Sequence, residues 1–122
     1  TISFNAPLAI LICYDSSVSW KRHYDKKDMG DVDSSIVTTQ MMLEIANLGL
    51  GTTWVGHFSL ELIKEKFNLP EYFVPVALLP IGYLSEDSVP NKLHNIRHDI
   101  QETVFFNSFE GIKPGKNKTT DH

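Results

Sequence analysis

Two histidines in the last third of the chain have the spacing of a metal site. His94 and His98 stand four residues apart, so on a helix their imidazoles would share one face and could hold one metal ion. A zinc site needs further protein ligands, and neither a cysteine nor a Glu motif accompanies this pair. We therefore interpret both histidines as surface residues, and we predict no metal site.

A run of aspartates offers a second candidate, a calcium-binding loop. Asp25, Asp28, Asp31 and Asp33 follow one another closely, but Gly30 precedes the last two acids and no glutamate closes the loop. Helix capping and solvation explain these side chains better than a bound cation does. The sequence also contains no catalytic triad, P-loop or dinucleotide-binding glycine motif, so we assign no catalytic side chain.

Length and composition describe an ordinary globular chain. The 122 residues suffice for one domain, and we predict one unit over 1–110 followed by a flexible tail over 111–122. A net charge of −4, with lysines gathered only in the tail, argues against a nucleic-acid partner. No apolar run approaches the ~20 residues of a membrane span. The single cysteine, Cys13, excludes an internal disulfide and favours a reducing, cytoplasmic location.

Hydrophobic periodicity and turn residues predict strands and helices that follow one another along the chain. The expected elements are a strand over 7–14, a loop or short helix over 15–30, a helix over 33–48, a strand over 52–55, a helix over 60–67, a strand over 74–83 and a strand-like piece over 103–106. Because the chain starts at Thr1 and soon enters an apolar strand, we expect a chain cut inside a domain.

The helix expected over 33–48 is apolar on nearly every side. Only Gln40, Glu44 and Asn47 form a narrow polar stripe. A helix of this kind is central in its fold, and in so short a chain its extra burial surface is expected to be a second subunit.

Several single residues are expected to begin, end or interrupt elements. We expect Asp31, Asp33 and Ser34 to cap the long helix and to favour its positive N-terminus, and Ser59 to cap the helix over 60–67. On that second helix we expect three apolar side chains to face inward, namely Leu60, Ile63 and Phe67. Gly49 suits a left-handed helix end. The prolines at 75 and 80 cannot donate to a strand ladder, so we expect the last long strand to be short or to lie at an edge.

A glycine-rich run and the pieces around it carry a family resemblance. The pieces are Asn5-Ala6-Pro7, Asp33 at the long helix, Leu48-Gly49-Leu50-Gly51-Thr52-Thr53-Trp54-Val55-Gly56, Leu69-Pro70-Glu71, Pro75 to Tyr83, and then Glu86, Asp87, Pro90, His94, Arg97 and Glu102. In this order and spacing the chain resembles the C-terminal part of the flavin-dependent nitroreductase family. The resemblance covers most of residues 5–106.

The resemblance implies an α+β fold with a mixed, mostly antiparallel sheet flanked by helices and incomplete at its N-terminus. It also implies FMN bound at the interface of a homodimer. The activity that it implies is hydride transfer from NAD(P)H through FMN to a small-molecule acceptor such as a nitroaromatic or a quinone. The cofactor carries the redox chemistry in such a protein, while the chain supplies orientation and electrostatics.

The resemblance also implies which residues would hold the cofactor. The backbone of Val55, Gly56 and His57, together with Trp54, would lie beside the isoalloxazine ring, and Arg97 would bind the phosphate. Asn95 occupies a position where some relatives have a second basic residue.

Three alternatives remain open. Gly56 could simply end a strand, and Arg97 could form a surface ion pair with Asp99 or Glu102. The whole chain could also be a non-catalytic flavin-binding or dimerisation module with a vestigial site, since the N-terminal segments that contact FMN in the family are absent here.

Overall fold

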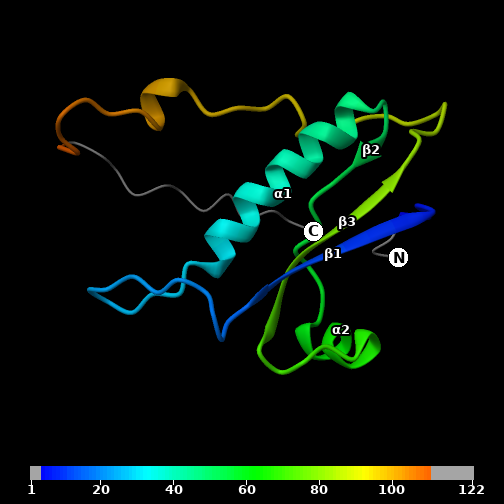
Figure 1. Cartoon of the computed structure of the whole chain (residues 1–122). Coiled ribbons are helices and arrows are strands. Elements are labelled where there is room, and N and C mark those ends of the chain that lie inside the picture. The colour runs from blue at the N-terminus through cyan, green and yellow to red at the C-terminus, as the bar shows by residue number, and fades with distance from the viewer. Residues whose placement is uncertain (1–3, 111–122) are drawn as a thin grey trace. The chain divides into compact units, whose positions relative to one another are not determined.

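The computed structural model of the protein describes residues 4–110 in two units, one ending at Ser88 and one beginning at Val89. The tail expected over 111–122 lies outside the described residues. The first unit contains β1 (Leu8–Asp15), α1 (Gly30–Asn47), β2 (Gly51–Thr52), α2 (Leu60–Phe67) and β3 (Phe73–Gly82) (Figure 1). Its three strands form one antiparallel sheet in the order β1-β3-β2, and the predicted α+β fold class is confirmed.

β3 is the central strand of this sheet, so the expectation of a short or edge strand is wrong. Its 10 residues pair with all of β1 on one side and with the short β2 on the other. Leu79 and Ala77, near its middle, are fully buried. The strand predicted over 52–55 is shorter than expected, because regular pairing stops at Thr52 and only Val55 makes a further isolated bridge.

The two prolines of β3 fall where the sheet needs no donor. Pro75 lies at the irregularity where the β1 register shifts after Ile12. Pro80 comes two residues after Leu78, whose backbone bonds Val55, so the Pro80 nitrogen faces that same side of the strand. There it faces the unpaired stretch between Thr52 and Val55. The missing N–H groups therefore cost the ladder little.

α1 begins earlier than residue 33, at the point where the chain packs on β1. A Cβ on Gly30 would lie 2.1 Å from the ring of Tyr14, so the helix can approach the strand only with glycine here. The N-cap residue is Met29, which makes no side-chain cap, so the expected capping by Asp31, Asp33 and Ser34 is wrong. The predicted placement of Asp31 and Asp33 at the positive N-terminus is confirmed, because both lie in the first turn, where the helix dipole favours their charge.

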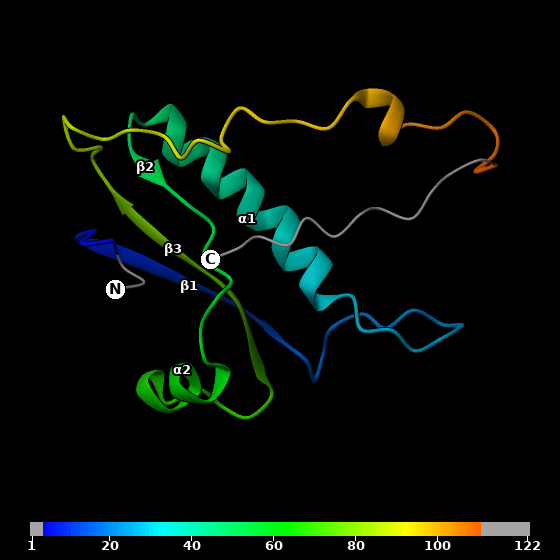
Figure 2. The same ribbon diagram turned by 180° about the vertical axis from the view of Figure 1, so that it is seen from behind.

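α1 runs along one face of the sheet, as Figures 1 and 2 show from opposite sides. The core between them consists of Ile45, Leu79 and Ile81, with Ile10, Met41, Met42 and Leu50 packed against it. The hydroxyl of the fully buried Thr38 donates to the Ser34 carbonyl at 2.6 Å, which satisfies it inside the helix. On the opposite side of α1, Val32, Ile36 and Leu43 are exposed.

α2 packs against β3 and begins as expected. The Ser59 hydroxyl accepts the Leu62 N–H at 3.3 Å, which confirms the predicted cap. Ile63 is buried, but Leu60 and Phe67 are exposed, so the prediction that both face inward is wrong. At the other end, Asn68 closes the helix in a left-handed conformation with φ 48°. The predicted left-handed Gly49 after α1 is also confirmed, with φ 74°.

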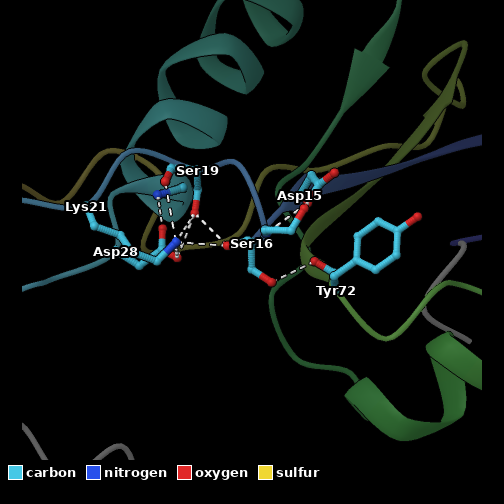
Figure 3. A network of polar contacts seen from close by, with 8 residues as sticks. Asp15, Ser16, Ser19, Lys21, Asp28 and Tyr72 are labelled. Atoms are coloured by element: carbon cyan, nitrogen blue, oxygen red, sulfur yellow. Dashed lines mark hydrogen bonds and ion pairs between the residues drawn. The ribbon is translucent and has the colours of Figure 1, made fainter.

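A polar network connects the loop after β1 to the start of α1 (Figure 3). Asp28 is its centre, because its carboxylate accepts the Ser19 hydroxyl at 2.7 Å and the Gly30 N–H at 2.9 Å, and lies 3.4 Å from the Lys21 ammonium. These contacts, the Gly30 N–H first, hold the pKa of Asp28 below its usual range. Nearby, Ser16 donates its N–H and its hydroxyl to the Tyr72 carbonyl, each at 2.8 Å, and so joins this loop to the start of β3.

The second unit, described from Val89 to Glu110, contains one 3-10 turn, η1 (Ile100–Glu102). The strand-like piece expected over 103–106 is wrong, because this stretch has no strand pairing. Phe105 and Phe109 contact each other with ring centroids 5.8 Å apart, while Phe106 and Phe109 stay exposed. Across both units, no helix among residues 4–110 is long and apolar enough to cross a bilayer.

Candidate functional site

Residues 54–57 lie between β2 and α2, and Val55 anchors them to the central strand. The Val55 N–H donates to the Leu78 carbonyl, and the Leu78 N–H donates back to the Val55 carbonyl, both at 3.0 Å. Val55 and Leu78 are also buried. The backbone of Val55 is therefore fully engaged and has no N–H to offer a ligand.

The N–H groups that follow Val55 are not engaged by β3. In an extended chain the N–H direction alternates, so a Gly56 that continues Val55 in this way would direct its N–H away from β3. Within residues 4–110, neither Gly56 nor His57 has its backbone N–H in a hydrogen bond. The sequence predicted a backbone N–H donor to the flavin ring at Val55, Gly56 or His57. Of these three residues, only Gly56 and His57 have an N–H that is free to donate.

Gly56 has room beside it that the fold does not fill. Its φ lies outside the left-handed region, and a Cβ built there would meet only Trp54, with Nε1 at 3.5 Å and Cδ1 at 3.8 Å. By contrast, a Cβ on Gly51 would come within 2.6 Å of Leu84, and one on Gly82 within 2.9 Å of Pro7. The Pro7 ring therefore explains glycine at 82, whereas the exposed Leu84 side chain could move aside from a side chain at 51, and the described packing does not by itself require glycine at 56.

The side chains on either side of Gly56 are open to solvent. Trp54 is 37% exposed and His57 is also exposed. One step back, the Thr52 hydroxyl is buried and has no hydrogen-bond partner among residues 4–110. We name residues 54–57 the ledge, since Val55 fixes it and its outer side carries free donors. Sequence reasoning missed Leu78 as its anchor, because only the strand register shows which residue lies opposite Val55.

The other two predicted site residues, Asn95 and Arg97, belong to the second unit. Arg97 Nη1 donates to the carbonyls of His94 at 2.7 Å and Ile96 at 2.9 Å. Arg97 does not form the alternative ion pair with Asp99 or Glu102, because none of the ion pairs among residues 4–110 includes Arg97. Trp54, Val55, Gly56 and His57 thus form one segment of the first unit. Asn95 and Arg97 lie in the second unit, which is described separately.

Two shallow grooves open elsewhere on the first unit. One, of about 350 Å³, runs along α1 and is lined by Asp31, Val32, Ser35, Ile36 and Thr39. The other, of about 360 Å³, lies between β1 and α1 and is lined by Leu11, Ile12, Cys13, Asp33, Ser34 and Val37. Burial raises the pKa of the Cys13 thiol in the second groove, which Lys64 partly offsets, so this cysteine is a poor nucleophile. Neither groove includes the ledge.

Comparison with known proteins agrees with this fold. The sequence model of the Nitroreductase family matches residues 2–83. This chain belongs to the nitroreductase family. A solved nitroreductase family protein from Clostridium difficile 630 superposes with a TM-score of 0.79 at 38% identity, covering 87% of this chain and 62% of that one. An FMN-dependent nitroreductase from Clostridium difficile R20291 superposes with a TM-score of 0.64 at 26% identity, covering 86% and 60%.

A curated relative extends the comparison to archaea. A protein from Methanothermobacter thermautotrophicus, whose name proposes an NADH dehydrogenase/NAD(P)H nitroreductase, is 33% identical over 92 residues. That match covers 68% of this chain and 43% of the relative. A second such relative, from Archaeoglobus fulgidus, is covered to 48%. The chain therefore spans about half the length of the curated relatives that it matches.

Proposed function

We propose that this nitroreductase chain forms part of an FMN-dependent oxidoreductase that passes hydride from NAD(P)H to a small-molecule acceptor such as a nitroaromatic or a quinone. The observation that carries the proposal is the ledge, an anchored segment whose outer side offers an unengaged N–H at Gly56 and space beside it. Support comes from the family match and from the FMN-dependent relative.

The ledge offers hydrogen-bond donors and space to a flat ring with polar atoms along its edge. FMN, when bound, supplies the hydride-accepting and hydride-donating chemistry. The chain contributes a fixed backbone at Val55, hydrogen-bond donors at Gly56 and His57, and room for a planar group where a side chain at 56 would stand. A donor held rigidly in this way stabilises negative charge on a bound group without reorganising.

Arg97 and Asn95 are the proposed phosphate contacts. In the structure the Arg97 guanidinium is held by two backbone carbonyls through a single nitrogen, Nη1, so Nε and Nη2 stay available for a bidentate contact. Asn95 is exposed and can add a neutral donor.

We propose in addition that the active form is a homodimer joined through the exposed apolar side of α1. Ile36 and Leu43 are 59% and 66% exposed on that side, although they are aliphatic side chains in the middle of the longest helix. Apolar area of this kind is normally covered by a partner.

Titration of FMN against the protein tests the flavin proposal, with Gly56→Ala as the decisive variant. The added methyl group finds ordinary contact distances inside the chain, so the thermal midpoint is expected to stay unchanged. It would, however, occupy the space that the ring needs, so FMN affinity is expected to fall at least tenfold. Glu65→Ala, on the exposed side of α2, is the matched control and is expected to bind FMN like the wild type.

Three outcomes would contradict the proposal. A wild-type protein that causes no change in flavin absorbance or fluorescence does not bind FMN. Equal affinity of Gly56→Ala and wild type would remove the ledge from the site. If FMN binds but neither NADH nor NADPH reduces it, the non-catalytic flavin-binding module is the correct function instead.

A further inference from the structure

The indole of Trp54 lies directly beside the open position at Gly56. Apart from Gly56 itself and its chain neighbours Val55 and His57, its Nε1 is the nearest heavy atom, at 3.5 Å, to the place where a Gly56 Cβ would be, and Cδ1 follows at 3.8 Å. The nitrogen edge of the indole, rather than its benzene ring, therefore borders the space that the fold leaves free.

This nitrogen is a hydrogen-bond donor without a partner. An indole Nε1–H can only donate. None of the side-chain hydrogen bonds among residues 4–110 uses it, and the Gly56 N–H on the same segment is unengaged as well. Trp54 is 37% exposed, so its indole is open to a bound group. Two donors of different kinds thus lie next to one uncrowded position.

We propose that the Trp54 indole N–H is a second hydrogen-bond donor to the flavin ring, acting beside the backbone N–H of Gly56. The proposal rests on the proposed flavin site. It adds Trp54 Nε1 as an atom that would hydrogen-bond to the polar edge of the ring. A carbonyl oxygen or ring nitrogen of the isoalloxazine accepts the bond. An aromatic residue that merely packed against Gly56 would not need its nitrogen edge on this side.

The second tryptophan of the chain is a built-in control. Trp20 is 60% exposed and lies in the loop between β1 and α1, where its carbonyl accepts the Met29 N–H. The sequence holds only these two tryptophans, so Trp20→Phe leaves Trp54 as the single indole. Trp54→Phe in turn removes the proposed donor while keeping a smaller aromatic ring.

The direct test follows the indole N–H resonances in ¹H–¹⁵N spectra while FMN is added. Trp20→Phe assigns the two resonances. The Trp54 indole proton is expected to move downfield on FMN binding and to exchange more slowly with water, as a proton does when it enters a hydrogen bond. The Trp20 resonance is expected to stay in place. An upfield shift of the Trp54 proton would show ring stacking without a bond and would overturn the proposal.

Affinity and spectrum provide the second readout. Trp54→Phe is expected to weaken FMN binding about three- to tenfold, the range of one net hydrogen bond, and to shift the visible absorption band of the bound flavin. Trp20→Phe is expected to change neither. If Trp54→Phe fails to fold, the resonance experiment still tests whether the Trp54 indole donates to FMN, because the proteins that it uses keep Trp54.

The results separate this inference from the proposed function. Wild-type protein that binds FMN, loses it on Gly56→Ala and shows no movement of the Trp54 proton keeps the flavin site but overturns the role of Trp54. Protein that binds no FMN overturns both.

Discussion

Three glycines in this chain differ in the constraint that the fold places on them. At Gly30 the Tyr14 ring leaves no room for a Cβ, at Gly49 the backbone is left-handed, and at Gly56 neither constraint is present. Sequence reasoning found the role of Gly49, because a glycine after an apolar helix is a local signal. It missed Gly30, because the ring that excludes a side chain there comes from a strand earlier in the chain.

Gly30→Ala is expected to destabilise the protein by about 1–3 kcal/mol, the usual cost of forcing an extra group into a packed site. The reason is the 2.1 Å approach of the new Cβ to the Tyr14 ring. Urea unfolding monitored by circular dichroism measures the change in the free energy of unfolding. Adding Tyr14→Ala to the variant should recover part of the loss, and a Gly30→Ala protein as stable as wild type would contradict the packing described at the start of α1.

At the scale of elements, local sequence signals predicted most helices and strands correctly. They did not predict which strands lie next to each other in the sheet. The helix at 60–67 and its Ser59 cap follow from a few adjacent residues, and both were predicted correctly. The position of β3 did not follow, because the cost of a proline depends on what lies opposite its nitrogen. Pro80 faces the gap between Thr52 and Val55, and only the pairing of the strands reveals that gap.

The loop between β1 and α1 is expected to loosen in acid. Arg22 forms an ion pair with Asp25 and holds the pKa of that carboxyl at about 2, and hydrogen bonds from Gly30 and Ser19 lower the pKa of Asp28. A lowered pKa means that the charged carboxylate stabilises the folded loop. This contribution is complete above the ordinary aspartate pKa of about 4 and is lost as the pH falls from there toward about 2.

Fluorescence of Trp20 in a Trp54→Phe background measures this loosening, because Trp20 lies in the loop. Asp25→Asn should alter the Trp20 signal at pH 7, but the variant and its parent should converge as the pH approaches 2. Glu65→Gln on α2 serves as the control and should leave the signal unchanged. A difference between Asp25→Asn and its parent that stays constant across this range would reject the role of the Asp25 charge. The effect should also weaken with added salt, since the pair is exposed.

For the whole molecule, the distribution of apolar surface is the main observation. The sequence predicted a long helix that needs burial on several sides, and residues 4–110 bury only one side of α1. The ledge shows the same limit of prediction. Residues 54–57 were located by resemblance, whereas their fixed and free backbone groups became visible only when Leu78 was placed opposite Val55.

Sedimentation equilibrium should give the mass of a dimer for the wild type if α1 is the subunit interface. Leu43→Glu, which places a charge on the exposed apolar side, is expected to shift the protein to the monomer mass while the far-ultraviolet circular dichroism spectrum stays the same. Glu65→Lys, a charge change on α2, should leave the dimer intact. A wild type that is monomeric at micromolar concentration would contradict the proposed assembly.

The order of the strands has a consequence for synthesis. β1 and α1 are synthesised before β2, and the strand that lies between β1 and β2 comes after both, with Leu8 paired to Ile81, 73 residues further on (81 − 8 = 73). At about 5–20 residues per second, the backbone edge of β1 that pairs with β3 stays without its partner for roughly 4–15 s. During that interval the unpaired edge is open to pairing with other extended chains, and slower translation just before residue 73 would lengthen its exposure.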